Sequence, residues 1–118
     1  MGQQTGDARV DPRVDVRVPV VVFGAAPDRQ EIEMVTRNLS AGGTLCESAV
    51  SVPLGTPVSL RLDLADEAGV VHPVVSGAIA IRVEGGGPFT VAFHFVNAPA
   101  RVVDRVKRFV FRALRSSS

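Results

Sequence analysis

Residues Val58 to Leu64 read VSLRLDL, and apolar and polar side chains alternate at every position of this stretch. Its apolar side chains, Val58, Leu60, Leu62 and Leu64, fall on one face, and its polar side chains fall on the other. A period of two is typical of a β-strand that turns one face to a core and the other to solvent. The stretch therefore predicts a half-buried strand.

The same strand pattern recurs on both sides of this segment. Residues 16–23 are largely β-branched, and residues 31–37, 74–83 and 89–96 alternate or nearly alternate. A further short strand is expected around Cys46, and turn-forming sequences rich in Gly, Pro and Asp separate the strands. Short strands with tight connections and no helix between them predict an antiparallel sheet, closed or nearly closed into a β-barrel. The fold class is all-β dominated.

Only the end of the chain changes to helical spacing. From Ala98 to Leu114 the apolar residues fall on one face of a helix, with Asn97 expected as its N-cap. The opposite face carries five arginines: Arg101, Arg105, Arg108, Arg112 and Arg115. Two interpretations of these arginines remain open, namely the solvated face of a helix packed on the barrel, or a surface for nucleic acid or an acidic partner.

Composition limits the class of protein. A chain of 118 residues with 46% hydrophobic and 21% charged residues is most simply one globular domain. No apolar run is long enough to cross a bilayer, so we expect no membrane insertion, and the polar N-terminus lacks a secretory pattern, so we expect a cytoplasmic protein. With Cys46 as its one cysteine and two histidines far apart, the sequence predicts no metal site.

Two polar segments stand out from the strand pattern. NLSAGG, residues 38–43, lies between two predicted strands, and ARVDPRVDVRV upstream spaces Arg9, Arg13 and Arg17 four residues apart. The hexapeptide can be a turn in which Asn38 and Ser40 bond to their own backbone. It can also be a place where small polar groups receive a ligand.

Read together, these segments resemble the two motifs of a PilZ domain. Arg9 to Arg13 has the form RxxxR directly ahead of the first strand, and Asn38 to Gly43 has the form [D/N]xSxxG after the second. The resemblance extends from Arg9 to Leu114. It implies a bacterial receptor for cyclic di-GMP built on a six-stranded antiparallel barrel with a C-terminal helix. The expected organisation is a flexible leader over residues 1–8, a PilZ domain over 9–115 and a disordered tail over 116–118.

The resemblance also implies roles for individual residues. Arg9 and Arg13 would close over the ligand from a flexible leader, since Arg can pair with phosphate and with a guanine edge and can stack on a purine. Asn38 would meet a base edge and Ser40 a base or phosphate. Gly43, with Gly42 sharing its role, would provide a positive φ and close ligand approach. Arg17 would face outward from a strand, unless the ligand is gripped by Arg13 and Arg17 instead.

The sequence departs from the family pattern at two positions: Ala8 stands where many members carry another Arg, and Asn38 where many carry Asp. The alternative to a receptor is an adaptor of the same fold that has no working ligand site. A nucleic-acid-binding barrel is disfavoured because the chain has no Trp or Tyr, and its six Phe are expected in the core. His72 and His94 lack a nucleophile partner, so the sequence predicts no enzyme. We expect the signal to pass to a downstream partner protein.

Overall fold

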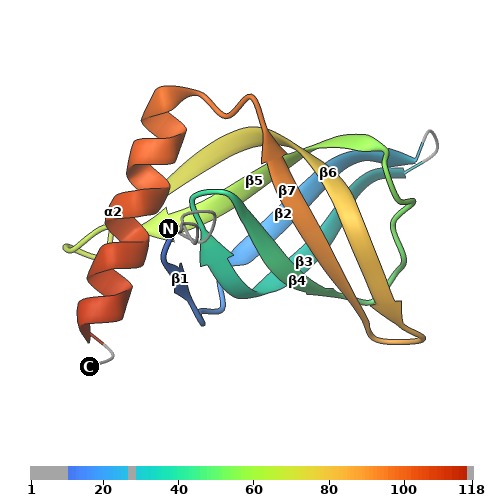
Figure 1. Cartoon of the computed structure of the whole chain (residues 1–118), viewed down its shortest axis with the longest axis horizontal. Helices are drawn as coiled ribbons and strands as arrows, with labels where there is room; N and C mark the ends of the chain where they lie inside the picture. Colours follow the sequence, from blue (N-terminus) through green and yellow to red (C-terminus); the bar gives the residue numbers. More distant parts are fainter. Residues whose placement is uncertain (1–10, 27–28, 117–118) are drawn as a thin grey trace, which may run out of the picture.

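The structure is a computed structural model that describes residues 11–26 and 29–116. Within these ranges the chain forms seven strands and one helix (Figure 1): β1 (Arg13–Val14), β2 (Pro19–Ala26), β3 (Arg29–Ser40), β4 (Gly43–Ser48), β5 (Pro57–Ala65), β6 (Val71–Gly85), β7 (Phe89–Val96) and α2 (Ala100–Ser116). Several strands are longer than the hydrophobic alternation predicts, because backbone pairing continues beyond the last buried side chain. The first strand of the barrel begins at Pro19 and not at Val16.

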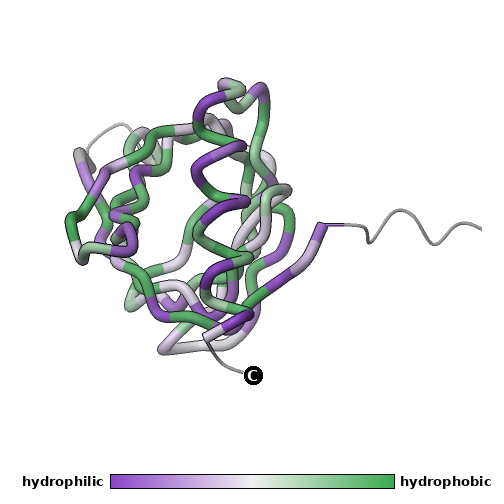
Figure 2. The backbone as a smooth tube through the Cα atoms, turned by 90° about the vertical axis from the view of Figure 1, so that its left-hand side faces the viewer, coloured by the Kyte–Doolittle hydropathy of each residue, from purple (hydrophilic) through white to green (hydrophobic). Residues whose placement is uncertain are grey.

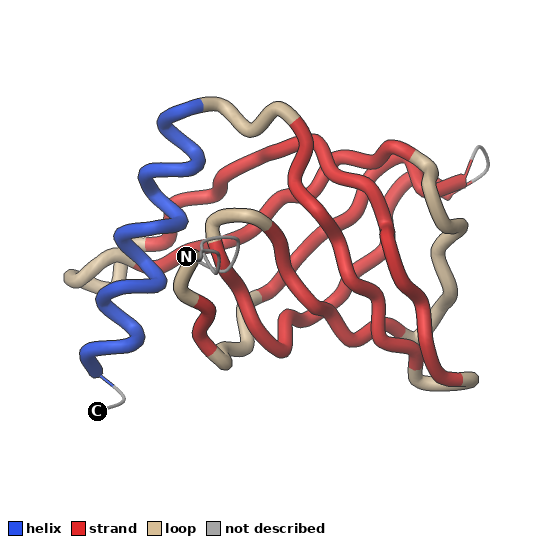
Figure 3. The backbone as a smooth tube through the Cα atoms, viewed as in Figure 1, coloured by secondary structure: helices blue, strands red, loops and turns tan. Residues whose placement is uncertain are grey.

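Strands β2 to β7 close into a barrel. Their order is β3-β2-β5-β6-β7-β4, every neighbouring pair is antiparallel, and β4 pairs back onto β3. Figure 3 shows the strands wrapping around a common axis with short connections at both ends. The two-residue strand β1 adds to β3 beyond the last β2 pairing, through Arg13 opposite Ser40 and Val14 opposite Leu39. The predicted six-stranded antiparallel barrel with a C-terminal helix is confirmed.

The barrel interior is filled by alternate side chains of its strands. In β5, Leu60, Leu62 and Leu64 are at most 1% exposed, as their alternation predicts. Cys46 is fully buried among them, and burial raises the pKa of its thiol to about 12. The thiol therefore stays protonated at neutral pH, and Cys46 acts as a small apolar core residue.

Strand β6 departs from the predicted alternation at its middle. The alternation within residues 74–83 groups Ile79, Ile81 and Val83 on one face, but Ala78 and Ala80 are the buried residues and Ile81 is 60% exposed. The pairing with β7 shifts register between Ala80 and Arg82, which is the mark of a β-bulge. Before the bulge Ala78 and Ala80 face the core, so Ile81 faces outward, and the extra residue then brings Val83 back to the core side.

Helix α2 packs its apolar face on one end of the barrel (Figures 1 and 2). Val102, Val106, Phe109 and Val110 are buried and belong to the same core as the strands. The prediction of Asn97 as N-cap is wrong: the first helical amides, those of Val102 and Val103, donate to the carbonyl oxygen of Pro99. Asn97 instead has a φ of 53° and turns the chain from β7 into the helix.

The prediction that all six Phe lie in the core is also wrong. Phe93, Phe95 and Phe109 are buried, but Phe111 is 48% exposed because it lies outside the apolar face of the helix.

No helix in the described part of the chain is long and apolar enough to span a membrane. Within residues 11–26 and 29–116, no group of three or more His, Cys, Asp and Glu side chains comes together to hold a metal.

Candidate ligand-binding site

The Arg13 end of the RxxxR segment and the NLSAGG hexapeptide lie side by side in the structure. Strand β1 pairs with the end of β3, which sets Arg13 directly opposite Ser40. The neighbouring Val14 is 5% exposed and anchors β1 in the core, while the Arg13 side chain faces solvent. Arg13 therefore lies in a short strand, not on a flexible leader as predicted. Arg9 lies outside the described residues.

An open hollow of about 730 Å³ adjoins this pairing, and we call it the Ser40 hollow. One side is formed by Asp11, Pro12 and Arg13, and its floor by Ser40 and residues 42–45 of the turn and β4. The far side comes from β6 and β7 and includes Ile81, Arg82 and His94. Four separate parts of the chain thus contribute to one surface concavity.

A second hollow of about 490 Å³, the Asn38 hollow, is lined by Asp15, Val16, Arg17, Arg37, Asn38 and Leu45. Leu45 lines both hollows. Arg13 Nη1 approaches Asn38 Oδ1 at 3.4 Å, a long contact that connects a residue of the first hollow to a residue of the second. Asn38 is half-buried and follows a register shift between β3 and β4, whereas the sequence placed it after the strand.

The Ser40 hydroxyl is engaged within its own turn. The Gly42 amide donates to Ser40 Oγ at 3.2 Å, and Ser40 Oγ donates to the Gly43 carbonyl oxygen at 3.3 Å. Ser40 is 3% exposed. These are the bonds of a side-chain-stabilised turn, so Ser40 adopts the first interpretation of the hexapeptide.

The structure requires glycine at position 43 for a reason other than the predicted positive φ. Gly43 does not have a positive φ. In the described part of the chain, the residues that do are Asn97 and five glycines other than Gly43. A Cβ at Gly43 would lie 2.3 Å from the carbonyl oxygen of Phe93 on β7. The residue is buried where β4 meets β7, so close backbone approach, not turn conformation, requires the missing side chain.

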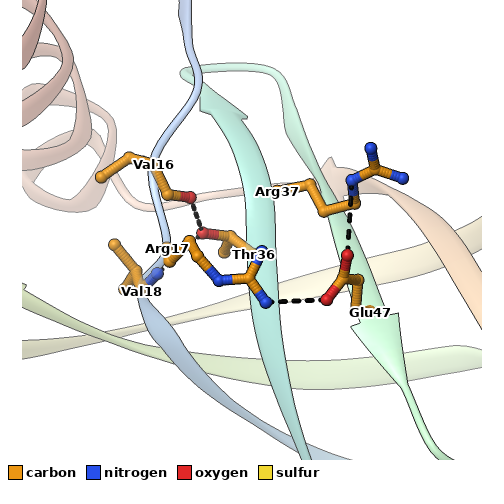
Figure 4. Close-up of polar contacts among 6 residues, drawn as sticks. All are labelled: Val16, Arg17, Val18, Thr36, Arg37 and Glu47. Carbon is orange, nitrogen blue, oxygen red and sulfur yellow. Dashed lines mark hydrogen bonds and ion pairs between the residues drawn. The ribbon is translucent and has the colours of Figure 1, made fainter.

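Residues 16–18, which connect β1 to β2, are held to β3 by Thr36 (Figure 4). The buried Thr36 hydroxyl accepts from the Val18 amide at 2.9 Å and donates to the carbonyl oxygen of Val16. Backbone bonds between Thr36 and Val18, and between Val16 and Arg37, add to this anchor. The connection is therefore fixed although it is not a regular strand. Arg17 faces outward as predicted, but from this connection and not from a strand.

Arg17 is paired with a carboxylate. Arg17 Nη2 lies 2.7 Å from Glu47 Oε1, and Arg37 Nε lies 3.5 Å from Glu47 Oε2 (Figure 4). The hydrogen bond from Arg17 is the main cause that lowers the pKa of Glu47 from its usual value. Both arginine side chains are more than half exposed, so the pair is a surface ion pair at the border of the Asn38 hollow.

Sequence reasoning missed Asp11, Ile81, Arg82 and His94, which also line the Ser40 hollow. Asp11 was hidden inside the RxxxR segment; its carboxylate lies within 3.2 Å of the position that a Cβ on Gly42 would take. His94 is exposed on β7. Its place in the hollow follows from the pairing of Gly43 with His94 across β4 and β7, which local sequence patterns do not specify.

A match to a family model agrees with this fold and pair of motifs. The model of the PilZ domain matches residues 7–112, nearly the whole chain. The chain therefore belongs to the PilZ domain family. A search of curated proteins found no match.

Solved structures share the fold. The inhibitor of motility MotI/DgrA of Bacillus subtilis has a TM-score of 0.79 and 18% identity over 92% of this chain, which spans only 51% of that protein. The PilZ domain of YcgR from Escherichia coli, solved with c-di-GMP, has a TM-score of 0.69 and 16% identity, covering 91% of this chain and 92% of that one. The PilZ domain of CeSA from a cellulose-synthesizing bacterium has a TM-score of 0.61 and 25% identity, and the match covers 85% of this chain and 95% of that one.

Proposed function

We propose that this chain is a receptor for cyclic di-GMP that binds the nucleotide in the Ser40 and Asn38 hollows and passes the signal to a partner protein. One observation carries the proposal. Arg13 and Ser40 belong to motifs more than twenty residues apart, and strand pairing sets them directly opposite each other beside an open hollow. The structure of the YcgR PilZ domain with c-di-GMP supports the choice of ligand.

The chemistry of the site suits a ligand with phosphates and guanines. Arg13 has an exposed guanidinium that makes a long contact with a neutral amide, so it can turn to a phosphate or a guanine edge at little cost. Arg9, four residues earlier, would supply the second guanidinium. The proposal uses the side-chain amide of Asn38 for a base edge, because an amide carries both donors and acceptors.

Ser40 and the glycines would act through the shape of the turn. The Ser40 hydroxyl accepts from Gly42 and donates to Gly43, which fixes a compact turn at the floor of the hollow. Gly42 is half-exposed there, and the absence of a side chain leaves room for the ligand. The site as proposed has binding groups and no catalytic step.

A second function, that of an adaptor without a working ligand site, is favoured by the same hydrogen bonds. They satisfy the Ser40 hydroxyl within the turn, and Glu47 already pairs with Arg17 and Arg37 and offsets one of their two positive charges. An adaptor would use the barrel only to present a surface to its partner. Direct binding measurements separate the two functions.

Titration calorimetry with cyclic di-GMP is the test. We expect saturable binding, with weaker or no binding of GTP, GMP and cyclic di-AMP. Arg13→Ala should remove most of the heat, whereas Arg101→Ala, an exposed arginine that lines neither hollow, serves as the matched control and should bind normally. No heat with the wild-type chain at ligand concentrations of about 50 μM, where a Kd of about 1 μM saturates the site, would favour the adaptor.

A further inference from the structure

A third concavity lies between helix α2 and the turn that joins β5 to β6, and we call it the helix groove. It measures about 460 Å³, and four arginines of the helix form one wall: Arg105, Arg108, Arg112 and Arg115. Asp66 and Glu67 of the turn form the other. The helix groove shares no lining residue with the Ser40 or Asn38 hollow.

The groove has a fixed shape. The Arg112 guanidinium donates to the carbonyl oxygen of Ala65 and lies over the Phe109 ring, 5.4 Å from its centroid, which ties the helix to the end of β5. On the opposite wall, the Asp66 carboxylate accepts from the Ala68 and Val70 amides, both at 2.9 Å, and contacts His72 Nε2 at 2.8 Å. Asp66 is thus engaged in holding its own turn.

Charge is distributed unevenly between the helix and the rest of the chain. Helix α2 carries six basic side chains and one carboxylate, a net charge of +5, whereas the whole chain carries +1. The residues outside the helix therefore sum to −4. The carboxylate of the helix is that of Asp104, which forms an exposed ion pair with Arg108 at 3.1 Å. Phe111, 48% exposed, lines the groove beside these arginines. Arginines and exposed aromatic residues together are typical of the centre of a protein interface.

We propose that the helix groove docks an acidic segment of a partner protein, with carboxylates along the arginine wall and an apolar side chain against Phe111. Arginine favours this occupant because its planar guanidinium pairs bidentately with carboxylates. A continuous polyanion such as a nucleic acid would meet Asp66 and Glu67 on the opposite wall, whereas a peptide can present its charge on one side only. The inference rests on the proposed function only in identifying this partner as the recipient of the signal.

The experiment measures the fluorescence anisotropy of a labelled helical peptide that carries glutamates at i, i+4 spacing around one leucine. We expect saturable binding that weakens as salt is added. Arg108→Glu should weaken it about tenfold, and Phe111→Ser should also weaken it. Lys107→Glu changes the same charge at an exposed helix position outside the groove, so it should change the affinity no more than about twofold.

Other outcomes overturn the inference. Equal losses in Arg108→Glu and Lys107→Glu would show general attraction to a basic helix, and no binding of the peptide would remove the docking surface. The peptide can also fail to bind while duplex DNA or phosphatidylserine vesicles bind. If Arg108→Glu then abolishes that binding, the groove belongs to that ligand and not to an acidic peptide.

Cyclic di-GMP is titrated into the same samples. Peptide binding without nucleotide binding would support the docking groove and reject the receptor function. Nucleotide binding without peptide binding would support the receptor function and reject the docking groove.

Discussion

Arg17 Nη2 lies 2.7 Å from Glu47 Oε1 although the two residues are 30 positions apart in the sequence. The same carboxylate contacts Arg37 through its other oxygen. Arg13, four residues before Arg17, makes a long contact with the neutral amide of Asn38. Two arginines that look equivalent in the sequence are therefore in different electrostatic states, and Arg17 must leave a carboxylate before it can bind an anion, whereas Arg13 leaves a neutral amide.

The first prediction separates these two arginines. Arg13→Ala should weaken cyclic di-GMP binding by roughly ten- to a hundredfold, because each charge-assisted hydrogen bond contributes about 1.5 to 3 kcal/mol. Arg17→Ala should weaken it much less. Calorimetry measures both affinities, and the melting temperature of Arg13→Ala should stay near that of the wild type because its side chain is exposed. If Arg17→Ala were the more damaging change, the ligand would be gripped by Arg13 and Arg17, and the assignment of Arg9 would be wrong.

The second prediction concerns pH. The hydrogen bond from Arg17 lowers the pKa of Glu47 from 4.5 in the folded chain. A lowered folded-state pKa means that the pair contributes stability above pH 4.5 and loses it as the pH falls through the folded pKa. Glu47→Gln should therefore melt slightly below the wild type at about pH 7, and the difference should shrink as the pH falls through the lowered folded-state pKa of Glu47. Thermal melts over a series of falling pH values measure it, and a difference that grows in acid would contradict this role of Glu47.

Local sequence patterns were enough to predict the barrel. The alternation of Leu60, Leu62 and Leu64 and the change to helical spacing near Ala98 each depend on neighbouring residues, and the structure confirms both the barrel and the terminal helix. Ile81 and Val83 share a face in the sequence alternation but not in the structure, because a bulge between Ala80 and Arg82 separates them, and a bulge depends on how β6 pairs with β7. Asn97 failed as an N-cap because the chain turns there before the helix begins at Ala100.

The candidate site was only partly predictable. The resemblance grouped Arg13, Asn38 and Ser40, and the structure makes them neighbours through the β1–β3 pairing and the Arg13–Asn38 contact; their role in binding a ligand stays a prediction. The far side of the Ser40 hollow includes Arg82 and His94, which follow Ser40 by 42 and 54 positions in the sequence, so only the closed sheet reveals it. The Arg17–Glu47 pair was missed for the same reason.

The third prediction tests the structural role of Gly43. Gly43→Ala should lower the stability by about 1 to 3 kcal/mol, because its Cβ would lie 2.3 Å from the backbone oxygen of Phe93 and backbone must move. Gly42→Ala is the matched control, since its nearest atom, at 3.2 Å, belongs to the movable Asp11 side chain. Thermal denaturation should show a loss of roughly 4 °C per kcal/mol for Gly43→Ala and little change for Gly42→Ala. Equal melting temperatures for the two variants would contradict the assignment.

The last prediction concerns Asp11, whose carboxylate lies over the Ser40 to Gly42 turn at the edge of the Ser40 hollow. A phosphate that enters the hollow meets this negative charge, and two like charges about 4 to 6 Å apart repel by roughly 1 kcal/mol even in water. Asp11→Asn keeps the size of the side chain and removes the charge. It should therefore tighten cyclic di-GMP binding by about fivefold, and the gain should shrink as salt screens the repulsion.

Calorimetry at low and high salt checks this prediction. Glu31→Gln is the matched control, because it removes the same charge from an exposed position of β3 that lines neither hollow. The control should leave the affinity unchanged, since repulsion between exposed charges is screened over a distance of about 10 Å at ordinary salt. Weaker binding by Asp11→Asn would mean that the carboxylate contacts the ligand favourably, through the N–H edge of a guanine, and supplies the negative charge that Asn38 lacks.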